Sequence, residues 1–233
     1  MKILAIDCTA SPASAAVLED GKILSSAYTN IGLTHSQTLI PMVNSVLSNA
    51  KISLDDIDYF AINAGPGSFT GVRIGVAALK GLTLFRGNCI VSVSTLESMA
   101  YNYFGVSDVV VCGAMDARCK QVYTARFDVE SRVERLVPDS AIAIEELGKQ
   151  LQLSDKSTAL VGDGAALCYN VLGSKVANLS LAPEQLRYQN AVSVARCAED
   201  KLKNGYQPIS SEELLPVYLR APQAERQLKK KRS

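Results

Sequence analysis

The chain has 233 residues, of which 48% are hydrophobic and 6% aromatic, with no tryptophan and a formal net charge of +1, so its length fits one large domain or two small ones. No run of 18 or more apolar residues occurs, and we therefore expect no membrane span. The six cysteines are scattered without a Cys-x-x-Cys pair, which argues against a disulfide framework or a zinc site and predicts a cytoplasmic protein.

The chain opens with a predicted strand and hairpin. Residues 3–6 are apolar and end at Asp7, and a loop of small residues follows. Residues 15–18 resume an apolar run, and after a short polar turn residues 23–28 return as a further strand. A loop of small residues thus joins the acidic residue at the end of a buried strand to the hairpin.

The next segment predicts an amphipathic helix over residues 36–49. Its apolar residues follow the i, i+1, i+4, i+7, i+8 spacing of one helix face. They are Leu39, Ile40, Val43, Val46 and Leu47. The single histidine of the chain, His35, precedes this helix, so a paired-histidine metal motif cannot be built. We expect a structural or interface role for His35 and no metal site, because metal ligands come in clusters.

Residues 61–80 predict a buried strand, a Gly-Pro-Gly turn and a second helix. Gly65 and Gly67 give the turn backbone freedom. Gly71 and Gly75 lie four residues apart on one helix face, although each costs roughly 1 kcal/mol relative to alanine. We favour packing inside the domain over a closely packed partner helix as the reason for this face. The turn also resembles a backbone nest for an anion, but no Walker-type Gly-Lys-[Ser/Thr] follows it.

The second half of the chain repeats this order. A strand at 109–112 leads to Asp116, a strand at 121–127 follows, and an apolar run at 159–161 precedes a Gly-Asp-Gly loop at 162–164 and another helix. Strand–Asp–loop–strand and strand–Gly-x-Gly–helix therefore each occur twice. This order predicts a duplicated α/β architecture with two subdomains.

The chain ends with a predicted helix at 193–203 that returns to the first subdomain. We expect residues 1–104 and about 190–220 to form that subdomain, 105–189 the second, and 221–233 a basic, flexible tail. Five basic residues fall in the last eight positions, which leaves 19 basic and 23 acidic residues elsewhere. A solvated terminus is the favoured interpretation, and an arm that contacts tRNA phosphates, as in an RNA-binding module, stays open.

Six segments in chain order resemble the TsaB (YeaZ-like) family. They are MKILAIDCT at 1–9, THSQTLIP at 34–41, AGPGSFTGVRIG at 64–75, MDAR at 115–118 with the following Val-Tyr at 122–123, VGDGA at 161–165 and PVYLR at 216–220. The combination covers nearly the whole chain. The resemblance implies the duplicated actin-like ATPase and sugar-kinase (ribonuclease H-like) fold, whose members carry an aspartate after the first strand of each half.

The resemblance also implies a function. The TsaB family supplies a non-catalytic subunit that pairs with its paralogue TsaD, with the ATPase TsaE as a further partner, and forms a homodimer when alone. The assembly transfers a threonylcarbamoyl group to the adenosine beside the tRNA anticodon, so ATP and a metal are expected on the partner subunits and no cofactor in this chain. The residues that we expect at the TsaD interface are Leu39, Val43, Val46, Leu47, Gly71, Arg73, Ile74, Gly75 and Ala78.

An alternative function is a self-sufficient actin-like phosphotransferase or hydrolase, with Asp7 and Asp116 around magnesium and ATP. The loop after Asp7 lacks the glycine that ATPases of this superfamily usually carry, which counts against an independent ATP site. We therefore expect no catalytic residue and at most a vestigial nucleotide cleft. Its residues would be Asp7, Thr9, Gly65, Gly67, Asp116, Gly162 and Gly164.

Overall fold

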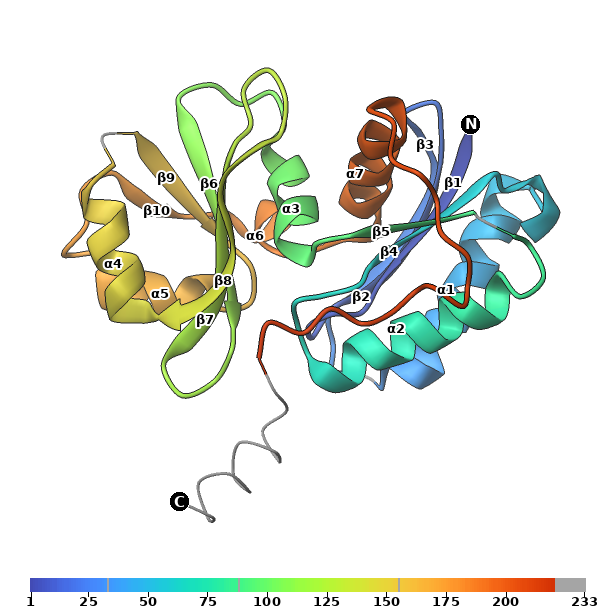
Figure 1. Cartoon of the computed structure of the whole chain (residues 1–233), viewed down its shortest axis with the longest axis horizontal. Coiled ribbons are helices and arrows are strands. Elements are labelled where there is room, and N and C mark those ends of the chain that lie inside the picture. Colours follow the sequence, from blue (N-terminus) through green and yellow to red (C-terminus); the bar gives the residue numbers. More distant parts are fainter. Residues whose placement is uncertain (33, 88, 155, 221–233) are drawn as a thin grey trace, which may run out of the picture.

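The computed structural model describes residues 1–32, 34–87, 89–154 and 156–220. Two five-stranded sheets lie side by side, each with helices on both faces (Figure 1). No helix in these ranges is long and apolar enough to cross a membrane. The predicted basic tail, 221–233, lies outside the described residues.

The first sheet has the order β3-β2-β1-β4-β5. Its central strand, β1, is antiparallel to β2, which is antiparallel to β3, and β1 is parallel to β4, which is parallel to β5. The strands are β1 (Lys2–Asp7), β2 (Ala13–Glu19), β3 (Lys22–Thr29), β4 (Tyr59–Asn63) and β5 (Ile90–Val93).

The second sheet repeats this plan in the order β10-β9-β6-β7-β8, with β6 in the place of β1. Its strands are β6 (Val109–Asp116), β7 (Gln121–Asp128), β8 (Glu134–Ala143), β9 (Ser157–Val161) and β10 (Leu179–Leu181). The identical strand order and directions confirm the predicted duplicated α/β fold with two subdomains.

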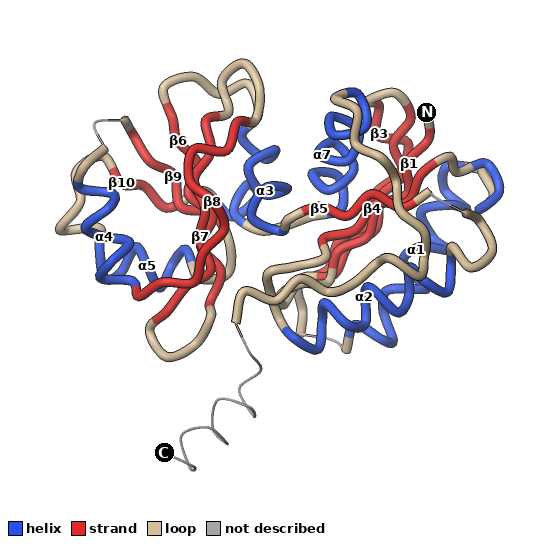
Figure 2. The backbone as a smooth tube through the Cα atoms, in the orientation of Figure 1, coloured by secondary structure: helices blue, strands red, loops and turns tan. Residues whose placement is uncertain are grey.

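Helices cover both faces of each sheet (Figure 2). In the first sheet, Leu4 and Ile6 of β1 point to α1 and α2, whereas Ile3 and Ala5 point to α7, because side chains alternate along a strand. In the second sheet, α4 and α5 cover one face and α3 the other. The helices are α1 (His35–Ala50), α2 (Phe69–Leu82), α3 (Thr95–Ala100), α4 (Ile144–Gln152), α5 (Ala165–Leu172), α6 (Glu184–Arg187) and α7 (Ala191–Lys203), with 3₁₀ turns η1 (Leu54–Asp56) and η2 (Tyr101–Tyr103).

The long helix α7 returns to the first sheet, where Val194 and Cys197 pack with β1, β2 and β5. Its start is set by Asn190, whose side chain accepts a hydrogen bond from the Ser193 N–H (3.0 Å). The short helix α3 packs with the second sheet, although our expected division at 104/105 assigns it to the first subdomain.

The apolar face of α1 packs on the chain's own sheet. Leu39, Val43, Val46 and Leu47 are buried and form one cluster with β1, β4 and α2. The family resemblance assigns these four side chains to the partner interface, and the structure corrects this: in the folded chain they belong to its core. Ile40, beside them in sequence, is 38% exposed because it lies off the buried stripe.

Adjacent residues on α1 test this division between core and surface. We expect Leu39→Ala to lower the free energy of unfolding by about 2–5 kcal/mol, because it leaves a cavity under the helix. Ile40→Ala should cost less than about 1 kcal/mol. Urea unfolding followed by circular dichroism measures both, and equal losses would contradict the assignment of Leu39 to the core.

Candidate functional site

The end of the first strand places a buried carboxyl group beside the next strand. Asp7 is 1% exposed, and its Oδ1 accepts hydrogen bonds from the Thr9 hydroxyl (2.8 Å) and the Asn63 side-chain amide (2.8 Å). The parallel register of β1 and β4 sets Asn63 beside it. Its Oδ2 has no hydrogen-bond partner in the described part of the chain, and burial raises the pKa of Asp7 to about 6.

The glycines of the first half bring the start of α2 against the loop that follows β1. A Cβ at Gly67 would overlap the Thr9 carbonyl oxygen, and a Cβ at Gly71 would overlap that of Cys8. At Gly75 it would lie 3.0 Å from the Cys8 sulfur. The internal-packing interpretation of this glycine face is therefore confirmed.

The same contact uses the backbone donors of the loop. The Ser68 N–H donates to the Thr9 carbonyl oxygen (2.6 Å), and the Gly71 N–H donates to the Ser68 hydroxyl, which caps α2 (3.3 Å). An anion nest needs such donors to point at the ligand. The turn is thus a packing contact within the chain, with these two donors already paired.

The expected interface residues of α2 divide between the core and the surface. Gly71 and Gly75 are buried against the first strand, which corrects their assignment to a partner contact. Ile74 and Ala78 are partly buried and pack against the same apolar cluster. Arg73 is exposed and could meet a partner without unfolding the chain.

The second half repeats the close approach. A Cβ at Gly162 would overlap the Ala114 carbonyl oxygen, and one at Gly164 would lie 2.8 Å from the Asp116 nitrogen. The Asp116 N–H donates to the Asp163 carboxylate (3.1 Å). Asp116 is less buried than Asp7, and its carboxylate accepts from the backbone N–H of Arg118 (2.7 Å) and pairs with that guanidinium (3.2 Å).

Six of the seven predicted cleft residues therefore form two groups, one at the end of each central strand, whereas Gly65 lies against Val217. The first contains Asp7, Thr9 and Gly67, and the second Asp116, Gly162 and Gly164. No hydrogen bond or ion pair among the described residues joins the two groups directly. The loop after Asp7 does reach the second half, where Ala10 packs in the cluster that contains Met115.

Sequence reasoning missed a C-terminal strap, residues 206–220, that crosses the start of α2 (Figure 1). The Val217 N–H donates to the Ala64 carbonyl oxygen (2.7 Å), and a Cβ at Gly65 would overlap the Val217 carbonyl oxygen. The Tyr218 ring stacks on Phe69 with centroids 4.9 Å apart, and its hydroxyl accepts from Arg73 (3.1 Å). Its only sequence signal was the PVYLR segment, which carried no structural prediction.

Two further features bear on ligands. The Nε2 atom of His35 lies 2.7 Å from the Ala10 carbonyl oxygen. In the described ranges, no group of three His, Cys, Asp or Glu side chains is arranged to hold a metal ion. A cavity of about 610 Å³, which we did not predict, lies between β3 and α6, with Tyr28, Glu184 and Tyr188 in its wall. Among the residues that the structure describes, no lysine or arginine lines it, so the described wall does not favour phosphate.

Comparison with known proteins identifies the family. A family model described as "TsaD: tRNA N6-adenosine threonylcarbamoyltransferase" matches residues 29–228. A Bacillus subtilis protein named "tRNA threonylcarbamoyladenosine biosynthesis protein TsaB" is 31% identical over 182 residues, 75% of this chain and 78% of that protein. This chain belongs to the TsaB family. A TsaB protein of Haemophilus influenzae is 28% identical over 94% of each chain.

The likeness to TsaB extends to the solved structures. YeaZ from Pseudomonas aeruginosa superposes with a TM-score of 0.78 at 25% identity, over 94% of this chain and 99% of that one. Together with the repeated strand order, this confirms the predicted actin-like, sugar-kinase type fold for the TsaB chain.

Two glycines of α2 make a matched test of the close approach. We expect Gly71→Ala to lower the free energy of unfolding by about 3 kcal/mol or more, because the new methyl group overlaps a backbone oxygen that cannot turn away. Gly81, on the same helix, has open space within 4 Å of the place that a Cβ would take, and Gly81→Ala should raise stability by up to about 1 kcal/mol. Equal effects in chemical unfolding would contradict the packing contact.

Asp7 gives a test by pH. Its folded pKa, about 6, lies above the ordinary value of 3.8, so the folded protein binds this proton more tightly than the unfolded chain. The tighter binding of this proton stabilises the folded state fully below about pH 4, and the stabilisation is lost as the pH rises through 6. The free energy of unfolding changes by about 3 kcal/mol over this range. Relative to Asp7→Asn, the wild-type protein should therefore lose stability over this range. If the curves of unfolding free energy against pH were parallel for the wild-type protein and Asp7→Asn, the pKa of Asp7 would not be raised by folding.

Proposed function

We propose that this TsaB-family chain is a non-catalytic subunit that pairs with a TsaD paralogue and supports threonylcarbamoyl transfer to the adenosine beside the tRNA anticodon. The observation that carries the proposal is the family membership, because its curated relatives are named for tRNA threonylcarbamoyladenosine biosynthesis. The packed glycine turns support it, since two donors that a phosphate would use are bonded within the chain.

In this proposal the chemistry lies on the partners. ATP and the metal belong to TsaD and to the ATPase TsaE, and this chain contributes a surface. The single histidine of the chain supports the assignment, because the paired-histidine metal motif expected of TsaD cannot form here. Pairing of two copies in the absence of TsaD, and contact of the basic tail with tRNA, are further parts of the same proposal.

The surface proposed for TsaD is the outer side of α1 and α2, since their inner sides hold the core. On α2 the exposed positions Arg73, Ala77 and Gly81 follow one another at four-residue spacing, and Ile40 lies exposed on α1. Ala77 and Gly81 are small enough to let a partner helix approach closely, and Ile40 offers apolar area to bury. Tyr218 of the strap is hydrogen-bonded to Arg73, so the strap extends this surface.

Matched alanines test the proposed surface. We expect Ala77→Arg to weaken the complex with the TsaD counterpart by roughly tenfold or more, because a long cation replaces a methyl group in a close helix contact. Ala177→Arg makes the same change at an exposed position of the second half and should leave the affinity unchanged. Light scattering of the mixed proteins gives the stoichiometry, and calorimetric titration gives the affinity.

Three outcomes separate the alternatives. A one-to-one complex that only Ala77→Arg weakens supports both the function and the surface. A complex that survives Ala77→Arg would move the interface elsewhere on the chain. Absence of a complex, together with ATP turnover by the pure chain that Asp116→Ala abolishes, would overturn the proposal in favour of a self-sufficient phosphotransferase. Gly75→Arg is unsuitable as a test, because its side chain would enter the core beside Cys8.

A further inference from the structure

The two halves of the chain meet where α3 contacts α7 (Figure 1). Each helix buries its apolar residues in its own half: Leu96 and Met99 of α3 pack with the second sheet, and Val194 and Cys197 of α7 with the first. Gly113 leaves room for Leu96 on the second sheet. Apolar contacts have little directional preference, so this packing alone does not fix the angle between the halves.

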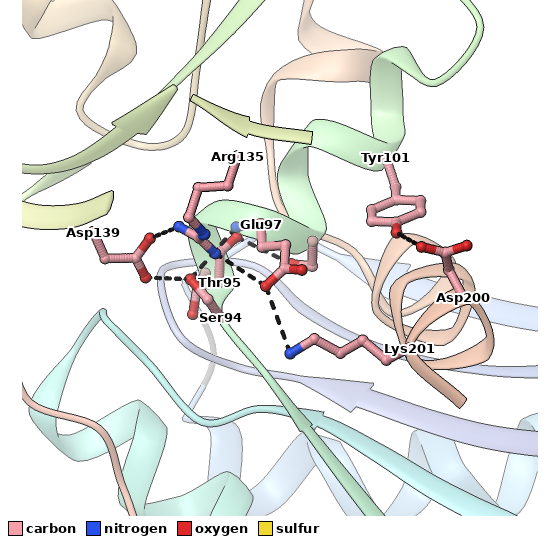
Figure 3. A network of polar contacts seen from close by, with 9 residues as sticks. Ser94, Thr95, Glu97, Tyr101, Arg135, Asp139, Asp200 and Lys201 are labelled. Atoms are coloured by element: carbon pink, nitrogen blue, oxygen red, sulfur yellow. Dashed lines mark hydrogen bonds and ion pairs between the residues drawn. The ribbon is translucent and has the colours of Figure 1, made fainter. Parts of the chain in front are cut away.

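Directional contacts cross the joint at three places, and Figure 3 shows those made by Glu97 and Tyr101. The Glu97 carboxylate on α3 lies 3.6 Å from the Lys201 ammonium on α7. The Tyr101 hydroxyl donates to the Asp200 carboxylate (2.9 Å), and burial raises the pKa of Tyr101, which keeps it a donor. At the third place, the Asn190 side-chain amide, just before α7, donates to the side-chain oxygen of Asn102 (2.9 Å).

The same carboxylate is held from the second half. Arg135 of β8 lies 3.0 Å from Oε2 of Glu97, the oxygen that also faces Lys201. Arg135 also pairs with Asp139. The Asp139 carboxylate accepts a hydrogen bond from the Ser94 hydroxyl (2.5 Å), and Ser94 caps the start of α3. Glu97 thus lies between a cation of each half, with α3 fixed to β8 on one side and to α7 on the other (Figure 3).

The three charged side chains around Glu97 are partly buried, so we expect their interaction to be stronger than that of an exposed ion pair. Those of Glu97, Lys201 and Arg135 are 21%, 26% and 31% exposed, so salt screens them less than fully exposed charges. Without Glu97, the cations of Arg135 and Lys201 would face each other with no anion between them. A carboxylate shared by two cations in a network is coupled more strongly than separate pairs.

We propose that Glu97, Arg135, Asp139 and Lys201, with Tyr101 and Asp200, form an interhalf latch that fixes the angle between the two halves, so that the isolated chain does not open or close about its α3–α7 joint. The latch goes beyond the proposed pairing with TsaD, because it acts within one chain. It makes this chain a rigid body whose shape does not depend on nucleotide.

A distance measurement between the halves tests the latch in the isolated protein. Of the six cysteines only Cys119, in the second half, is exposed, so a spin label there and a second at Ser48→Cys on the exposed side of α1 report the angle by double electron–electron resonance. We expect one narrow distance distribution that MgATP does not shift. Glu97→Gln should broaden it or add a second distance.

The matched control is Glu146→Gln, which removes an exposed ion pair with Lys149 within α4 and should leave the distribution narrow. Lys201→Gln removes the cation of α7 and leaves the pairing of Glu97 with Arg135. It serves as the second variant should Glu97→Gln fail to fold, and we expect it also to broaden the distribution. A narrow, unchanged distribution in folded Glu97→Gln or Lys201→Gln would overturn the latch. A shift of the wild-type distance with MgATP would overturn the claim of rigidity.

Discussion

In each half of this chain, a glycine loop packs against the backbone at the end of the central strand, and this contact organises that half. At Gly67 and Gly71 the start of α2 lies so close to Thr9 and Cys8 that a methyl group has no room. The approach sets where α2 lies on the first sheet. Gly162 and Gly164 do the same against the end of β6, so one local solution is used twice.

That constraint also decides what the end of the first strand can do. Two backbone N–H groups of the turn, those of Ser68 and Gly71, donate to oxygens of the chain itself. Asp7 is buried beside Thr9 and Asn63, where the neutral acid is favoured more than in water. The end of the first strand is thus a packed contact within the chain.

The two halves are joined by directional polar contacts in addition to apolar packing. Each half has its own apolar clusters, and α3 and α7 bury their apolar sides in opposite halves. Apolar contacts cross the joint, such as Tyr101 in the cluster of the first half and Ala10 in that of the second. Polar, directional contacts cross it too, with Glu97 between Lys201 and Arg135. Burial therefore stabilises each half, and in our proposal the directional contacts around Glu97 fix the angle between them.

The sequence by itself determined the duplicated α/β plan, the two strand-end aspartates, the returning helix and the family resemblance. These depend on the order of elements, on local periodicity and on glycine positions, all of which a linear chain displays. It also favoured internal packing for the glycine face of α2, and the structure agrees. The cysteine spacing and the single histidine fixed the expectations about disulfides and metal at the same level.

Only the tertiary structure decided which side of each helix meets the core. The stripe Leu39–Val43–Val46–Leu47 has the same periodicity whether a sheet or a partner covers it, and the sheet does. The strap over α2 was invisible because its contacts, such as Val217 with Ala64, join residues far apart in the chain without any periodic pattern. The charges around Glu97 come from α3, β8 and α7, and nothing in their sequence spacing shows that folding brings them to one point.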